Sequence, residues 1–202
     1  PVIALVLKGA EIGPARFWAI ISAPRTLAAL RVTVTAAFAA TLFNAFYGLL
    51  MAWVLTRYDF PGKRILDALM DVPFALPTAV AGISLTALYS ANGWFGAPLA
   101  GLGIEVVYTL GGVILAMTFT SIPFVVRAIQ PVLEDLDPTL EQAAMTLGAR
   151  PFAIFRRVVL PAIWPAWLSG STIAFARSLG EFGAVVFICL LYTSPSPRDK
   201  RQ

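Results

Sequence analysis

Arg177 and Glu181 are the charged pair whose surroundings most suggest a chemical role, because both lie inside a long apolar segment. A charge at the centre of a membrane helix costs roughly 2.5–3.5 kcal/mol, so such residues usually face a protein interior or water. Their i, i+4 spacing places them on one face of a helix. Arg177, with Ser178 beside it, could attract an anion or help to form a gate. The alternative, which we favour, is a structural ion pair, because Glu181 would repel an anion.

The sequence contains few residues that could form a metal site, a nucleotide-binding loop or a catalytic centre. The chain has no histidine, which is the commonest general base and metal ligand, and its single Cys189 excludes an internal disulfide. Gly62-Lys63 is followed by Arg64, with no glycine five positions before Gly62, so there is no Walker A loop. We therefore expect no metal site, no cofactor and no catalytic residues, and an intramembrane enzyme has little support.

The composition indicates a membrane protein. Of the 202 residues, 58% are hydrophobic and only 13% are charged, against roughly 25% charged in soluble domains. The mean hydropathy is +0.79. A soluble domain of this length could not bury so much apolar surface, so the sequence predicts an all-α, polytopic transmembrane helical bundle. The net charge of +4 is then better explained by membrane topology than by nucleic-acid binding.

Four segments are long and apolar enough to cross a membrane. They are residues 32–55, 69–90, 108–126 and 163–191. Pro73 and Pro77 predict a kink in the first half of the second segment. Small residues recur in the first segment at spacings that let helices approach closely, namely Ala36, Ala40, Gly48 and Ala52.

The charges between these segments predict their orientation. Residues 56–68 contain Arg57, Lys63 and Arg64, residues 91–107 contain no lysine or arginine, and residues 127–162 again contain four arginines. The excess of positive charge on cytoplasmic loops therefore places the first and third connections inside the cell. Residues 8–31 run against this rule, because their four basic residues would then lie outside.

The most ordered polar passage is residues 137–161, which we call the elbow. Asp137-Pro138 is a typical helix start, and Gly148 a typical helix end. Between them an apolar stripe is formed by Leu140, Ala143, Ala144 and Leu147. Pro151 begins a second short helix, which Pro161 closes, with an apolar face of Phe152, Phe155 and Val159. A membrane-surface helix and a partner-docking helix are both open, and the small alanines favour a partner.

The elbow carries a motif that resembles the permease subunits of bacterial ABC importers. Their pattern is Glu-Ala-Ala, three residues, Gly, nine residues, Ile, one residue, Leu-Pro. This chain has Gln142-Ala143-Ala144, then Gly148, Val158 and Leu160-Pro161, with Glu141 just before Gln142. In that family the elbow docks on the ATPase. The resemblance thus implies coupling residues Glu141, Gln142, Ala143, Ala144, Gly148, Leu160 and Pro161.

Residues 48–82, 119–138 and 177–188 also look like the sulfate/thiosulfate permeases, in the group that includes molybdate permeases. The resemblance implies an ATP-driven importer of sulfate or thiosulfate, with molybdate or tungstate as the alternative. A secondary transporter acting alone is a further hypothesis, which must explain the elbow without an ATPase. A polar path could be lined by Thr78, Ser84, Thr118, Thr120 and Ser121, although each is more often a helix-packing hydrogen bond.

The partners that the resemblance implies are ABC ATPase subunits, which would bind ATP and magnesium, a second permease subunit of sister type, a periplasmic sulfate-binding protein and membrane lipid. The expected location is the bacterial inner membrane. By the same resemblance, residues 1–188 form a permease domain that lacks most of the first of six helices and all of the sixth. Residues 189–202 resemble translated adapter sequence, and we expect them to be disordered.

Overall fold

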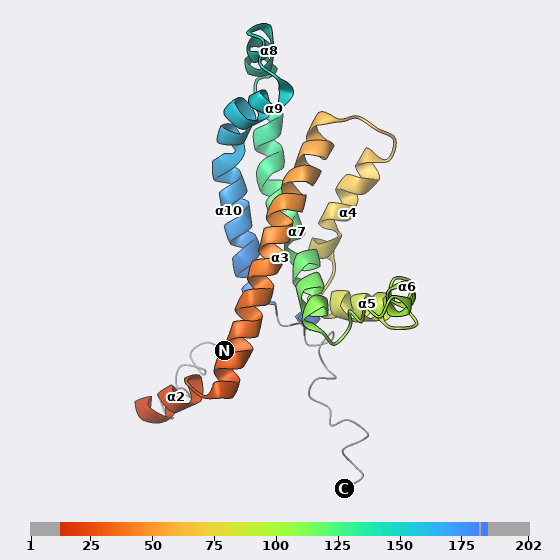
Figure 1. The fold of residues 1–202 in the computed structure, drawn as a ribbon, viewed down its shortest axis with the longest axis vertical. Coiled ribbons are helices and arrows are strands. Elements are labelled where there is room, and N and C mark those ends of the chain that lie inside the picture. The colour runs from red at the N-terminus through yellow and green to blue at the C-terminus, as the bar shows by residue number, and fades with distance from the viewer. Residues whose placement is uncertain (1–12, 182, 186–202) are drawn as a thin grey trace. The chain divides into compact units, whose positions relative to one another are not determined.

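The computed structural model describes residues 13–181 and 183–185, all helical or irregular with no strand, which confirms the all-α prediction for this part of the chain. The helices are α2 (Pro14–Ile21), α3 (Pro24–Arg57), α4 (Lys63–Ala75), α5 (Thr78–Tyr89), α6 (Gly96–Gly101), α7 (Leu110–Glu134), α8 (Pro138–Thr146), α9 (Pro151–Ile154), the π-helical turn η1 (Phe155–Val159) and α10 (Leu160–Leu179) (Figure 1). The chain divides into two units between Thr35 and Ala36. The contacts described below lie within the second unit.

Three helical stretches in the described residues are long and apolar enough to cross a membrane: Thr26–Arg57, Leu110–Glu134 and Pro151–Leu179. The pair formed by α4 and α5 passes the same test together, but it is bent by 117° at its break. The chain therefore bends in the predicted region, but the bend is a break between two helices and not a kink within one helix. Pro73 is accommodated within α4, and the break lies at Leu76 and Pro77.

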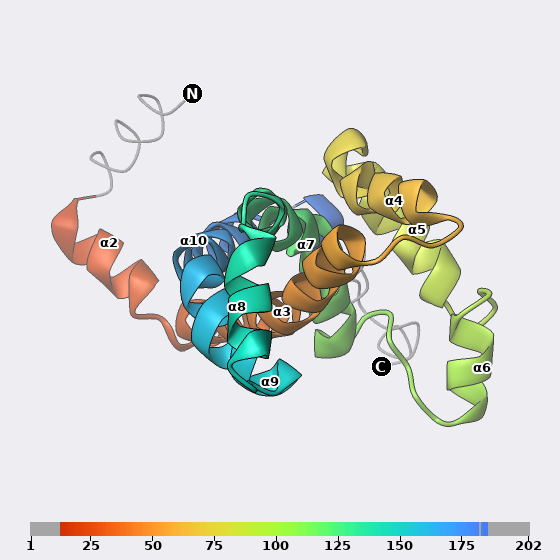
Figure 2. The same cartoon turned by 90° about the horizontal axis from the view of Figure 1, so that it is seen from above.

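The core of the second unit is built around α7 and α10, which lie side by side in Figures 1 and 2. One apolar cluster joins Val125, Val126 and Ile129 of α7 to Ile163 and Ala174 of α10. Small residues let α3 pack closely in this core, as the sequence predicts, because Ala36, Ala40 and Ala52 of α3 are fully buried. Outward-facing apolar side chains such as Phe38, Leu42 and Phe46 of α3 are more than half exposed, as a lipid-facing surface requires.

We expect Gly48→Leu to lower the stability of the folded protein. A Cβ atom at Gly48 would lie 2.8 Å from Val125 Cβ and Cγ1, and overpacking of this kind costs about 1–3 kcal/mol. Thermal unfolding of the purified protein in detergent measures the effect. Gly101→Leu is the matched control, because nothing lies within 4 Å of a Cβ atom at Gly101. Equal midpoints for the two variants would show that α3 and α7 are not in close contact there.

Several predicted boundaries were wrong. The helix predicted to continue to residue 191 ends at Leu179, where the chain turns at Gly180. Pro161 does not close the second elbow helix, because α9, η1 and α10 follow one another without a gap. Arg127 lies inside α7 rather than in a connection. The expected tail of residues 189–202, and most of residues 1–13, lie outside the described residues.

Candidate functional site

The first half of the elbow is a short helix with well-defined ends. The Asp137 side chain accepts a hydrogen bond from the Thr139 N–H (2.9 Å) at the start of α8, and this bond lowers the pKa of Asp137. At the other end Gly148 has φ +82°, and the Ala149 N–H returns to Ala144 O (3.0 Å). A left-handed residue that caps carbonyls in this way is the usual reason for glycine after a helix. The glycine bend is thus present as predicted.

The apolar stripe of α8 is largely uncovered in the described part of the chain. Leu147 is 88% exposed, and Leu140 is more than half exposed. Gln142 and Ala143 are exposed, and Ala144 is half-buried. Figure 1 shows α8 beyond the ends of α7 and α10, at the same end as the connection from α3 to α4. The helix therefore presents a small apolar face away from its own bundle.

The second half of the elbow belongs to the bundle. Val159 of η1 is fully buried, whereas Phe152 is 74% exposed, so the predicted common face of these residues is not formed. Phe155 packs edge-on against Trp53 of α3, with 5.4 Å between ring centroids. The π-helical turn lets this stretch continue into α10, and Leu160 and Pro161 are the first two residues of that helix.

The elbow is also tied to α3 by an ion pair between Arg57 and Glu141. These residues are 84 positions apart in the sequence, and their side chains are only 23% and 17% exposed. The Arg57 guanidinium carbon lies 5.3 Å from the centroid of the Trp53 ring, within the range of a cation–π interaction. Glu141, one of the predicted coupling residues, therefore faces its own chain.

A second polar cluster joins α4 to α7. Arg127 donates to Asp71 through Nε (2.8 Å) and Nη2 (2.6 Å), and to Asp67 Oδ1 through Nη1 (2.7 Å). It also donates to Gln130 Oε1 (2.6 Å). This cluster was not predicted from the sequence. The i, i+4 aspartates and the i, i+3 pair of Arg127 and Gln130 were the signal in the sequence that could have found it.

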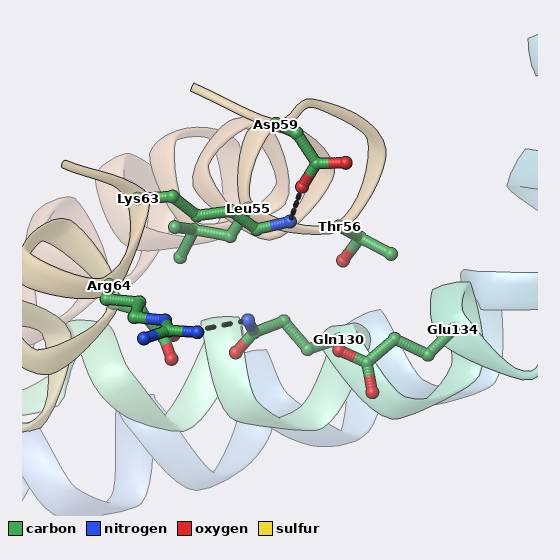
Figure 3. Close-up of a pocket in the computed structure, with 8 residues that line it drawn as sticks. Leu55, Thr56, Asp59, Lys63, Arg64, Gln130 and Glu134 are labelled. Carbon is green, nitrogen blue, oxygen red and sulfur yellow. Dashed lines mark hydrogen bonds and ion pairs between the residues drawn. The ribbon is translucent and has the colours of Figure 1, made fainter. Parts of the chain in front are cut away.

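A polar cleft of about 330 Å³ lies beside this cluster, between α4 and the ends of α3 and α7 (Figure 3). Its lining carries both signs of charge, with the cations Lys63 and Arg64 and the carboxylates of Asp59, Asp67 and Glu134. Lys63 Nζ pairs with Asp59 at 2.8 Å, and this contact lowers the pKa of Asp59. Because three carboxylates outnumber two cations in this lining, the cleft offers an anion no net attraction.

The predicted gate residues Arg177 and Glu181 form the ion pair that the sequence analysis favours, with 2.6 Å between Nη1 and Oε2. Glu181 is buried, and its other carboxylate oxygen accepts from the Ala184 N–H (3.1 Å). Thr78 lies against the same turn, because a Cβ atom at Gly183 would be 2.2 Å from Thr78 Oγ1. The structure thus brings Thr78, Arg177 and Glu181 together around residues 180–185.

Ser178 joins a buried polar cluster that the sequence analysis missed. Its hydroxyl donates to Ser121 Oγ (3.0 Å), which also accepts from Asn44 Nδ2 (2.8 Å). These three residues come from α10, α7 and α3, and all are fully buried. Thr120, another pathway candidate, is 4% exposed and donates to Met117 O (3.2 Å). Asn44 could have been recognised in the sequence, because it is the one side-chain amide within the apolar segment of residues 32–55.

Comparison with known proteins gives the family. Residues 44–202 match the family described as "Binding-protein-dependent transport system inner membrane component". The sulfate transport system permease proteins CysT of Salmonella typhimurium and Escherichia coli are each 56% identical over 188 residues, which is 93% of this chain and 68% of each relative. A probable sulfate permease of Nephroselmis olivacea is 50% identical over 93% of the chain and 66% of the relative.

Among solved structures, an amino acid ABC transporter aligns with 79% of this chain and 82% of its own, at 19% identity and a TM-score of 0.48. The family match covers most of the chain, and the described residues contain several apolar helices of membrane-spanning length. The chain is therefore a multi-pass membrane protein and belongs to the family of binding-protein-dependent transport system inner membrane components.

Proposed function

We propose that this chain is the permease subunit of an ATP-driven importer that moves sulfate or thiosulfate across the bacterial inner membrane. The observation that carries the proposal is the 56% identity to two sulfate permeases over 93% of the chain. The geometry supports it, because α8 offers an exposed apolar face at the end of the bundle.

The energy would come from partner subunits. We propose that two ABC ATPase subunits bind ATP with magnesium, that one of them docks on α8, and that a sister permease completes the pore. A periplasmic sulfate-binding protein would deliver the anion to the outer mouth, as the family description implies in general terms. This chain would then hydrolyse no ATP itself, consistent with the missing Walker A loop.

The bundle would transmit movement from the elbow to the pore. Movement at α8 would reach α10 through the continuous run of α9 and η1, and α3 through Arg57 and Trp53. We propose that Arg177, Ser178, Glu181, Thr78 and Thr120 hold the helices around the pore. None of their charges is free to bind a dianion, since Arg177 is neutralised by Glu181.

Labelled-sulfate uptake tests the proposal, in cells that cannot import sulfate and that express this chain with the ATPase, sister permease and binding protein encoded beside it. We expect uptake that excess unlabelled sulfate or thiosulfate blocks and molybdate does not. Stronger block by molybdate than by thiosulfate would move the chain to the molybdate and tungstate group. Uptake that persists when the ATPase gene is deleted would instead indicate a secondary transporter.

A further inference from the structure

Glu141 lies between two exposed residues, yet its own side chain is turned inward. Leu140 is 52% exposed and Gln142 is exposed, whereas the side chain of Glu141 is only 17% exposed and pairs with Arg57. Successive residues on an α-helix point about 100° apart, so a helix that presents positions 140 and 147 outward can present position 141 to its own bundle. Glu141 is therefore poorly placed to reach a docked ATPase.

The receiving end of this contact is one turn of α3. Arg57 is the last residue of α3 and Trp53 lies four residues before it, on the same face. Arg57 forms the ion pair with the carboxylate of Glu141. Trp53 makes a T-shaped contact with Phe155, and the Arg57 guanidinium lies over the Trp53 ring. A single turn of α3 thus contacts both halves of the elbow.

The contact between Arg57 and Glu141 joins α8 to the bundle across a long stretch of sequence. Within the part of the chain that the structure describes, α8 also packs on the next elbow helix, α9. Short connections at residues 135–137 and 147–150 link it covalently to α7 and α9. The half-buried Arg57–Glu141 pair therefore attaches α8 noncovalently to a membrane-spanning helix, and a rigid attachment is what transmission of force needs.

We propose that Glu141 is a positioning residue that clasps the elbow to α3 through Arg57, so that movement of the docked ATPase displaces α3 together with α10. The proposal rests on the proposed function. It assigns the ATPase-facing surface to Leu140, Ala143 and Leu147, which are exposed on one face of the helix, and it takes Glu141 out of that surface. Loss of the clasp leaves the ATPase bound and active but uncouples hydrolysis from transport.

The test compares E141Q, R57E, the exchange variant R57E/E141R and the control E105Q in the purified complex, reconstituted with its ATPase and binding protein. Glu105 is an exposed carboxylate away from the elbow, so E105Q is matched to E141Q in chemistry. Sulfate imported and ATP hydrolysed are measured in the same vesicles. We expect E141Q and R57E to lower the ratio of sulfate imported to ATP hydrolysed about fivefold, an effect of about 1 kcal/mol. We expect E105Q to leave this ratio unchanged and the exchange variant to restore it to at least half of its original value.

Two results would overturn the proposal that Glu141 clasps the elbow to α3. One is an unchanged ratio in E141Q. The other is loss of the ATPase subunit from E141Q during purification with no recovery in the exchange variant, which would show that Glu141 contacts the ATPase itself. Hydrogen exchange of α8 gives a readout that does not depend on the transported anion: E141Q must exchange faster there than E105Q. Failure of the proposed function is distinguishable, because the unmodified complex would then import no sulfate.

Discussion

Replacing Gly148 by arginine is expected to leave membrane insertion intact and to reduce ATP-driven uptake. Gly148 has φ +82° and nothing lies within 4 Å of a Cβ atom built there, so the cost comes from backbone conformation and not from space. A left-handed conformation costs a residue with a side chain roughly 1–2 kcal/mol. If the bend relaxes by that amount, the orientation of α8 changes, and we expect uptake per molecule to fall about 5- to 30-fold. The measurement is sulfate uptake normalised to the protein in the membrane fraction.

A series at the same position separates conformation from size. Asparagine enters the left-handed region more readily than other residues with a side chain, and a β-branched residue enters it least readily. We therefore expect Gly148→Asn to keep most of the uptake, and Gly148→Val to lose more than Gly148→Arg although valine is the smaller residue. A loss that follows side-chain size would instead point to a crowded docking surface. Normal uptake by Gly148→Arg would remove the bend from the coupling path.

The Arg177→Ala variant is expected to fail to accumulate as a folded protein. The Glu181 side chain is 1% exposed and Arg177 is its cationic partner, and removing one partner of a buried pair costs about 3–5 kcal/mol. That is a large part of the total stability of a typical domain. The amount of protein that survives detergent extraction and size-exclusion chromatography measures the effect.

The double variant R177M/E181Q identifies the role of this pair. It removes both charges, and glutamine keeps an oxygen that can accept from the Ala184 N–H, as Glu181 does. We expect it to recover accumulation and, because the pair is structural, most of the sulfate uptake. A double variant that folds normally but imports nothing would place Arg177 in the anion path, and our structural assignment would be wrong.

The sequence predicted the parts of this fold that depend on local pattern. Apolar length located the long helices, and Asp137-Pro138 and Gly148 set the limits of the first elbow helix because capping is a property of neighbouring residues. The end of α10 was missed because the apolar run continues past Leu179, while the actual break is made by the turn at Gly180. Hydropathy does not respond to such a turn.

The polar contacts were harder to predict because they join distant positions. Arg127 was counted as a loop charge that sets topology, yet it lies within α7 and is neutralised by Asp67 and Asp71 from α4. Glu141 was assigned to the ATPase surface on the motif, and its partner Arg57 lies 84 positions away. The Arg177–Glu181 pair, in contrast, was inferred from its i, i+4 spacing, although Glu181 lies just beyond the end of α10.

The most direct test of this account is sulfate accumulation by proteoliposomes that contain this chain with its sister permease and ATPase, with the binding protein outside and ATP supplied to the ATPase side. We predict accumulation that stops when ATP is replaced by a non-hydrolysable analogue or when the binding protein is omitted. Accumulation driven by an ion gradient without ATP would contradict the proposed role of the elbow as the point where the work of ATP hydrolysis enters the membrane domain.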